Sequence, residues 1–214
     1  MPLDAIQAKV INLFERWGLP KVMKFDNGHP FGSPSRESVP VLAMWLICLG
    51  IKVVWNKAYT PTDNAKVERN QAVSANWADP LQCADCDHLG QRLKEVCTIQ
   101  REHYKTRVWN KKTRLEVFPE LKTNPQKYDP EQVNLQLLFE FLATGQWARK
   151  VSSAGCVRIF GKQKYAGEKY QGQIIYITFD PLAKRWRLQD HNGTEFKAIP
   201  ETNLSWYNIK NLSI

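Results

Sequence analysis

The chain has 214 residues, of which 43% are hydrophobic and eight are Trp, and its formal net charge at neutral pH is +9. This composition excludes a mainly disordered chain, and the length leaves room for one or two domains. The positive excess extends over the whole chain, which suits a partner with a phosphate backbone because bound cations release condensed counterions. An ordinary basic protein has a similar charge, so charge alone leaves the partner open.

The sequence predicts no secretory or membrane segment. Its N-terminus lacks a basic stretch followed by an apolar one, and the apolar run from Val39 to Leu49 is too short to cross a bilayer. The five Cys are odd in number, which fits a reducing compartment better than a disulfide scaffold. We therefore expect a cytoplasmic protein with no membrane partner.

The first eighty residues alternate between helical and extended patterns. In chain order we expect a helix over residues 1–17, a strand over 21–25 ending at Asp26, a buried helix capped by Ser38 and running to about Leu49, a strand over 51–55, and a helix from Asn64 to about Trp77 capped by Asp63. This order predicts two parallel strands joined by a crossover helix.

The rest of the chain changes from helical to β patterns. We expect a long helix from His88 to about Val108, a polar link through Pro130, a helix over 135–142, and short strands over 157–160, 174–179, 185–189 and 196–199. Turn signals separate these strands at Gly161, Asp180-Pro181 and Asn192-Gly193. The segment from about Gln146 therefore predicts a small β domain, interpreted as a barrel.

Two acidic motifs carry the strongest chemical signal: KFDNGHPF at Lys24–Phe31 and TPTDNAKVERN at Thr60–Asn70. Asp26 ends a short apolar run, as a carboxylate at the tip of a buried strand would, and Glu68 lies near the start of a helix. Two carboxylates on different rigid elements of a basic protein suggest a divalent metal beside a phosphodiester.

This pair of motifs resembles the second and third acidic residues of bacterial DDE transposases and retroviral-type integrases. Residues 1–80 resemble the later half of their ribonuclease-H-like catalytic core. The tail resembles the small C-terminal barrel of Mu-like transposases through two motifs: Trp147-x-Arg149-Lys150-Val151 and Trp186 followed by Asp190 and Gly193. The resemblance thus covers most of the chain.

The resemblance implies a two-metal site for phosphoryl transfer, with Mg²⁺ or Mn²⁺ as the cofactor and three carboxylates as ligands. Asp26 matches the second carboxylate and Glu68 the third, so both are candidate catalytic and metal-binding residues. Asn64, one helical turn before Glu68, and Arg69 are candidate DNA contacts. The alternative interpretation makes Asp26 a turn residue and Glu68 a solvated helix residue; the joint match favours the site.

Two positions depart from the family pattern. Ala65 stands where the family commonly has Gly, a change that favours the helix. No residue matches the first aspartate of the triad, because Asp4 precedes Asp26 by only 22 positions and falls in the predicted first helix. We therefore expect an N-terminally truncated core that lacks the first strands, binds metal weakly and is inactive alone.

The tail mixes cations with aromatic residues, a composition that suits contacts with the DNA backbone. The alternative is a solvated surface over core aromatics, and the resemblance favours DNA. The candidate DNA-binding residues of the tail are Lys162, Lys164, Lys169, Arg185 and Arg187.

Zinc is the other cofactor that we considered. The spacing Cys83-x-x-Cys86-x-His88, with Cys97 and His103 nearby, lacks the second tightly spaced pair of a structural zinc site. We therefore expect no zinc.

Together these observations predict an α/β plus β protein with three regions. Residues 1–80 form a partial integrase-like core, 81–145 a helical connector and 146–214 a DNA-binding barrel. The predicted function is DNA transposition or integration, with element ends and target duplex as DNA partners, in a homo-oligomer or with a full-length transposase of a bacterial mobile element at the nucleoid. The alternatives are an inactive remnant that binds DNA or poisons an oligomer, and a zinc-stabilised interaction module.

Overall fold

The computed structural model describes residues 2–32, 38–57, 60, 62, 64–123 and 126–213. They fall into two compact units, which we describe one at a time. The first comprises Met1–Asn12, Pro20–Trp55 and Asp129–Ile214, and the second Leu13–Leu19 and Asn56–Tyr128. The independence of the regions 1–80, 81–145 and 146–214 stays a prediction.

The first unit contains the parallel strands expected near the N-terminus. The elements are β1 (Val22–Phe25), α2 (Val41–Cys48) and β2 (Lys52–Trp55). β1 pairs with β2 in parallel, from Val22 opposite Lys52 to Phe25 opposite Trp55. Two parallel strands joined by a crossover helix are thereby confirmed, and within the described residues they form a sheet of two strands.

Helix α2 is the centre of this part of the core. All of its residues from Leu42 to Cys48 are buried, against β2 and two further helices, α6 (Leu135–Ala143) and α7 (Trp206–Lys210). The predicted Ser38 cap is wrong: the helix begins at Val41, and Pro40 is its N-cap residue, with φ −61° and ψ 144°. A residue before proline avoids the helical conformation, so the helix cannot extend back through Val39 to Ser38.

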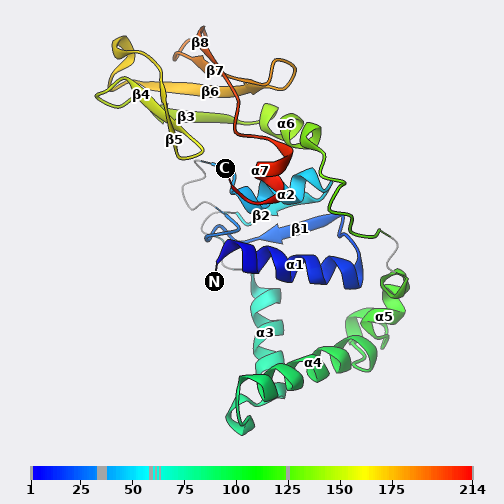
Figure 1. Ribbon diagram of the computed structural model, residues 1–214. Helices are drawn as coiled ribbons and strands as arrows, with labels where there is room; N and C mark the ends of the chain where they lie inside the picture. Colours follow the sequence, from blue (N-terminus) through cyan, green and yellow to red (C-terminus); the bar gives the residue numbers. More distant parts are fainter. Residues whose placement is uncertain are drawn as a thin grey trace. The chain divides into compact units, whose positions relative to one another are not determined.

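The C-terminal part of this unit is antiparallel. The strands β3 (Gln146–Lys150), β6 (Ile174–Asp180), β7 (Arg185–Gln189) and β8 (Glu195–Pro200) form one sheet in that order, and β4 (Cys156–Ile159) with β5 (Lys162–Tyr165) forms a separate hairpin (Figure 1). The predicted barrel is wrong, because in the described part of the chain β3 and β8 are edge strands that do not pair with each other. A closed barrel requires that pairing.

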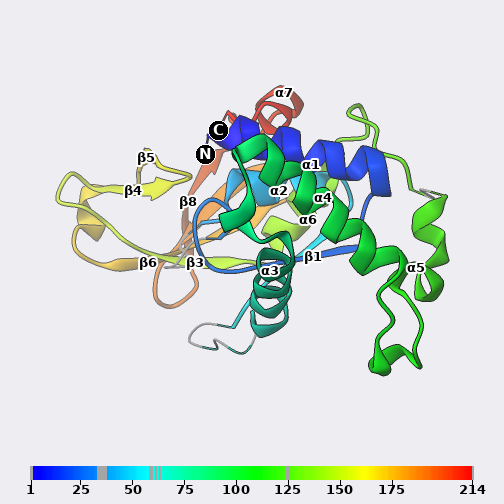
Figure 2. The same cartoon turned by 90° about the horizontal axis from the view of Figure 1, so that it is seen from below.

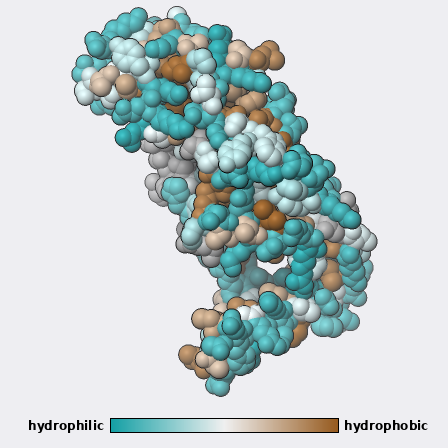
Figure 3. Space-filling view, viewed as in Figure 1, coloured by the Kyte–Doolittle hydropathy of each residue, from teal (hydrophilic) through white to brown (hydrophobic). Residues whose placement is uncertain are grey.

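Alternation along these strands builds the second part of the core. On β6 the buried residues are Ile175, Ile177 and Phe179, and on β7 they are Trp186 and Leu188. This period of two places the apolar side chains on one face of the sheet. The space-filling view shows mostly hydrophilic residues over the strands, with smaller hydrophobic patches between them (Figure 3).

The hairpin turns lie where Gly and Asn predicted them. Phe160 and Gly161 both have positive φ, 47° and 76°, as a two-residue turn between β4 and β5 requires. Gly193, at φ 80°, lies in the turn between β7 and β8. The strands β3 and β5 and the helix α7 were not predicted from the sequence patterns.

The second unit is helical. Its elements are α3 (Ala65–Ala78), a short turn η2 (Pro80–Gln82), α4 (Cys86–Glu102), η3 (Arg107–Trp109), α5 (Arg114–Val117) and η4 (Pro119–Lys122). Figures 1 and 2 show α3 and α4 joined through η2, with α5 beside the far end of α4. The predicted long helix is present as α4, but it begins at Cys86 because Asp85 caps it through the backbone N–H of His88.

Helix α1 (Leu3–Trp17) contributes residues to both units and confirms the first predicted helix. In the first unit, the Gln7 amide donates a hydrogen bond to the carbonyl of Lys210 in α7. In the second, the guanidinium groups of Arg16 and Arg101 each lie 4.8 Å from the Trp17 ring centre. No helix in the described residues is both long and apolar enough to cross a membrane.

Candidate active site

Asp26 lies in the first unit, immediately after β1, and its side chain is exposed. One carboxylate oxygen, Oδ1, accepts a hydrogen bond of 3.0 Å from the backbone N–H of Gly28. The other oxygen, Oδ2, accepts none from the described residues. The carboxylate is therefore oriented by its own loop and keeps one oxygen for an external ligand.

The loop after Asp26 folds back over the ends of the two strands. The Phe31 ring stacks on Phe25 with ring centres 4.9 Å apart, and the Trp55 indole N–H donates to the Phe31 carbonyl at 2.9 Å. A side chain at Gly32 would lie 2.6 Å from the backbone of Asp26 and Asn27, so only glycine fits there. The sequence patterns did not predict these anchors; the signal that could have found them was the aromatic Phe31 beside Gly32.

A hollow of about 360 Å³ borders this loop within the first unit. Its walls are largely aromatic or apolar, and Asn27 connects it to the Asp26 loop. A side chain at Gly145 would approach the Trp147 ring to 2.5 Å, so glycine leaves the room that this ring occupies. The residues lining the hollow are Asn27, Ser38, Val39, Pro40, Trp55, Phe141, Thr144, Gly145, Gln146 and Trp147.

Glu68 lies in the second unit, in the first turn of α3, with an exposed side chain. Its carboxylate makes no hydrogen bond or ion pair with any described residue. A carboxylate in the first helical turn is favoured by the partial positive charge at the helix N-terminus. The predicted helix is confirmed, and Glu68 is available to bind a cation.

Asn64 anchors the start of α3. It is the N-cap residue of this helix, and its side-chain oxygen accepts a hydrogen bond from the amide of Asn56, which is buried. The predicted capping residue Asp63 lies outside the described residues. Arg69 is exposed on the same helix. The structure thus gives Asn64 a structural role, and the predicted contacts of Asn64 and Arg69 with DNA stay predictions.

The two candidate catalytic carboxylates belong to different units, so their separation stays a prediction. Within each unit, the described residues contain no group of three or more His, Cys, Asp or Glu side chains arranged to hold a metal ion. The binding of one metal ion by Asp26 and Glu68 therefore stays a prediction.

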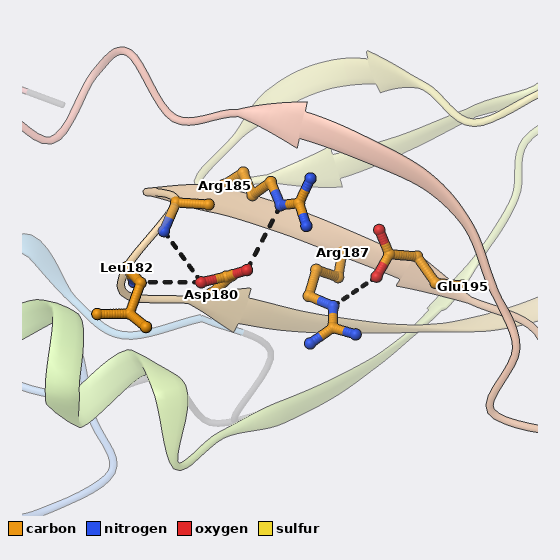
Figure 4. Close-up of polar contacts among 6 residues, drawn as sticks. Asp180, Leu182, Arg185, Arg187 and Glu195 are labelled. Carbon is orange, nitrogen blue, oxygen red and sulfur yellow. Dashed lines mark hydrogen bonds and ion pairs between the residues drawn. The ribbon is translucent and has the colours of Figure 1, made fainter.

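Two of the five candidate cations of the tail are paired with acidic residues (Figure 4). The Arg185 Nε lies 3.4 Å from a carboxylate oxygen of Asp180, its register partner on β6. The Arg187 Nε donates to the Glu195 carboxylate at the start of β8. Their charges are thus largely neutralised within the sheet, which weakens their candidacy as DNA contacts.

The other three cations have different surroundings. The Lys162 ammonium donates to the Asn203 side chain at 2.8 Å, and the Lys169 ammonium lies 4.8 Å from the Tyr170 ring centre. Lys164 is half-buried on β5, opposite Val157. Lys162 and Lys169 are exposed and keep their charge available.

Asp180 makes this sheet sensitive to acid. The pKa of Asp180 lies below its ordinary value, because its carboxylate accepts hydrogen bonds from the backbone N–H groups of Ala183 and Leu182 and faces Arg185. A carboxyl whose pKa is lower in the folded state stabilises the fold above its unfolded-state pKa, and this stabilisation is lost as the pH falls through the folded-state value.

We therefore expect the thermal midpoint of the wild type to fall more steeply below about pH 4 than that of Asp180→Asn. The asparagine keeps an acceptor oxygen for the turn but cannot titrate. Circular dichroism melts between about pH 7 and about pH 3 measure this difference. Parallel curves for the two proteins would contradict the assigned role of Asp180.

The Cys and His residues considered for zinc lie in the second unit. The Cys83 thiol faces the carbonyls of Ala78 and Asp79, and the His88 Nδ1 accepts a hydrogen bond from the backbone N–H of Ala84. Cys86 and Cys97 are eleven positions apart on α4, about 16 Å along the axis, too far to share one ion. Cys83 and His88 thus make contacts with the protein backbone, and the spacing along α4 separates Cys86 from Cys97.

Comparison with known protein families finds no family model that matches the chain.

Proposed function

We propose that this chain takes part in DNA transposition or integration by metal-dependent phosphoryl transfer, in the manner of the bacterial DDE transposases that it resembles. One observation carries the proposal. An exposed carboxylate, Asp26, directly follows the parallel strand β1, and a second, Glu68, lies in the first turn of the helix that follows the partner strand β2. Each has oxygens that the described residues leave without a hydrogen bond.

The strand pairing supports convergence of these carboxylates. β1 ends at Phe25 and β2 ends at its register partner Trp55, so both strands end at one edge of their sheet. Residues that follow the carboxyl ends of parallel strands gather at that edge and commonly form the site. We propose that Asp26 and Glu68 bind a divalent metal ion at that edge.

The donor chemistry of the two side chains fits Mg²⁺ or Mn²⁺. Both cations prefer oxygen ligands, and Mg²⁺ is commonly bound by one or two carboxylates completed by water and substrate phosphates. When bound, such an ion activates the attacking hydroxyl and stabilises the leaving oxygen. Asp26 and Glu68 would hold it, while Gly28, which lacks a side chain, would leave room for the DNA backbone.

Two further residues would support DNA binding, Arg69 by contact with a phosphate and Asn64 by holding the helix that carries Arg69. Arg69 follows Glu68 on α3 and offers a planar fork of donors that matches a phosphate. Asn64 fixes the start of that helix through Asn56. The family's first aspartate has no match in this sequence, so we propose that another segment or chain of the same assembly supplies the third carboxylate.

Metal binding tests this proposal without requiring turnover. We expect Asp26→Asn and Glu68→Gln each to weaken Mn²⁺ binding at least about tenfold, because each removes one of the two ligands that this chain is proposed to supply. Electron paramagnetic resonance measures free Mn²⁺ in the presence of a DNA duplex. Asp4→Asn and Glu95→Gln, which remove carboxylates elsewhere, serve as matched controls and should bind as the wild type does.

A second function is favoured by the absence of a three-ligand group among the described residues. In this alternative the chain binds DNA, or joins an oligomer of full-length transposase, without catalysis. Equal Mn²⁺ affinity in all four variants and the wild type, with duplex DNA still bound, would contradict the metal site and support this alternative.

A further inference from the structure

A cationic hollow lies between β3 and β4, and the arginines predicted to bind DNA, Arg185 and Arg187, are not among its lining residues. It has a volume of about 450 Å³, many times the roughly 30 Å³ of one water molecule. β3 and β4 lie side by side in the first unit (Figure 1). The residues lining the hollow are Ala148, Arg149, Lys150, Ser152, Cys156, Val157, Arg158 and Gln163.

The charge of this hollow has one sign. Its lining contains three cations, Arg149, Lys150 and Arg158, and no Asp or Glu. Arg158 and Lys150 are exposed and form no ion pair with an acidic side chain among the described residues. Arg185 and Arg187 of the same unit are instead paired with carboxylates. Gathered like charges repel one another, and a bound anion relieves that repulsion.

The protein backbone fixes one of these cations in place. The Arg149 Nε donates to the carbonyl of Arg158 at 3.2 Å, and its Nη1 donates to the carbonyl of Ala148 at 2.8 Å. The first bond connects β3 to β4, the second lies within β3, and together they orient the planar guanidinium. A guanidinium that is already oriented loses less conformational entropy when it binds an anion.

Neutral donors complete the lining. The Ser152 Oγ accepts a hydrogen bond of 3.1 Å from the backbone N–H of Cys156, which leaves its O–H as a donor. Gln163, opposite Arg158 in the β4–β5 hairpin, carries an amide with two donors. Two guanidinium groups, an ammonium, a hydroxyl and an amide around one hollow match the acceptor oxygens of a phosphate.

We infer that this hollow binds a phosphodiester of the DNA backbone, and that it is the main DNA contact of the β sheet. This inference rests on the proposed function, since that function supplies DNA as the ligand. It assigns a role to Arg149 and Lys150 of the Trp147-x-Arg149-Lys150 motif. It also moves the expected contact away from Arg185 and Arg187.

Duplex DNA binding by the full chain tests the hollow. We compare Lys150→Gln/Arg158→Gln with Lys9→Gln/Lys52→Gln, which removes the same charge from two exposed lysines of the first unit that do not line the hollow. At about 100 mM salt we expect the hollow variant to bind a random duplex about tenfold more weakly, with a salt slope smaller by 1 to 2, and the control to change by less than about threefold. Arg149→Lys, which keeps the charge but loses the fork, should fall between the wild type and the hollow variant.

The outcomes separate the inference from the proposed function. If both double variants lose the same affinity, charge alone binds the DNA and the hollow is refuted, while the proposed function stands. If the wild type fails to bind duplex DNA even at low salt, both are overturned. A separate experiment titrates inorganic pyrophosphate into the wild-type protein and follows its binding by ³¹P nuclear magnetic resonance. If pyrophosphate binds the wild type more tightly than DNA does, the ligand is a free anion and the inference fails.

Discussion

Replacing Trp186 by Ala is expected to lower the free energy of unfolding by about 3–5 kcal/mol. Trp186 is 1% exposed, and its ring centre lies 5.8 Å from that of Trp147, 5.3 Å from Phe160 and 4.8 Å from Phe179. Its indole N–H donates to the Glu201 carboxylate. The substitution therefore removes the centre of an aromatic cluster and leaves Glu201 without this donor.

Urea unfolding of the full chain measures this loss. Leu182→Ala is the matched control, because Leu182 is 91% exposed and its truncation should change stability by less than about 0.5 kcal/mol. Trp186→Phe keeps an aromatic ring but loses the N–H, and should fall between the two. A Trp186→Ala protein as stable as Leu182→Ala would mean that the β sheet does not depend on this cluster.

The elements that the sequence predicted correctly are those set by local patterns. Helix α2 is apolar along its whole length, which favours a buried helix, and the helix is present, although it begins at Val41 and not after Ser38. The turns at Gly161 and Gly193 require positive φ, which glycine adopts without strain. These signals act over a few residues, so they do not depend on the rest of the fold.

The features that escaped prediction depend on distant partners. β5, with the sequence KQKY, has no apolar alternation and becomes a strand because β4 pairs with it across the Phe160-Gly161 turn. Barrel closure depends on whether β3 and β8 meet, which no local pattern determines. Arg187 pairs with Glu195, which lies on β8 opposite Gln189, so the ion pair depends on how β7 and β8 align, and no local pattern separates Arg187 from the available cations.

The candidate site was predictable only in its parts. The strand before Asp26 and the helix that carries Glu68 both follow from sequence patterns, and both are present. Their relation to each other depends on the segment between β2 and α3, whose sequence is polar and carries no periodicity. The anchor between Asn56 and Asn64 also lies in that segment, and only the structure identifies it.

The proposed function requires the two carboxylates to come within about 4–8 Å of each other, the range in which carboxylates share metal ions. We expect Asp26→Cys/Glu68→Cys to form an intramolecular link in high yield with a bismaleimide of about that length, which adds one thiol across each of its two double bonds. The natural Cys83, Cys86, Cys97 and Cys156 are replaced by Ser beforehand. Cys48 stays, because burial raises the pKa of its thiol to about 12 and keeps it unreactive.

The matched control pairs Asp26→Cys with Glu95→Cys, which places the second thiol on α4 of the same unit as Glu68. Mass spectrometry of the digested protein measures the yield, and an equimolar mixture of the single-cysteine proteins measures links between molecules. The metal site requires the 26–68 link to exceed both controls severalfold. A 26–68 yield no higher than that of the mixture would mean that the carboxylates do not meet. Catalysis by this pair would then be excluded, because neither carboxylate alone can hold the ion between the attacking and leaving oxygens.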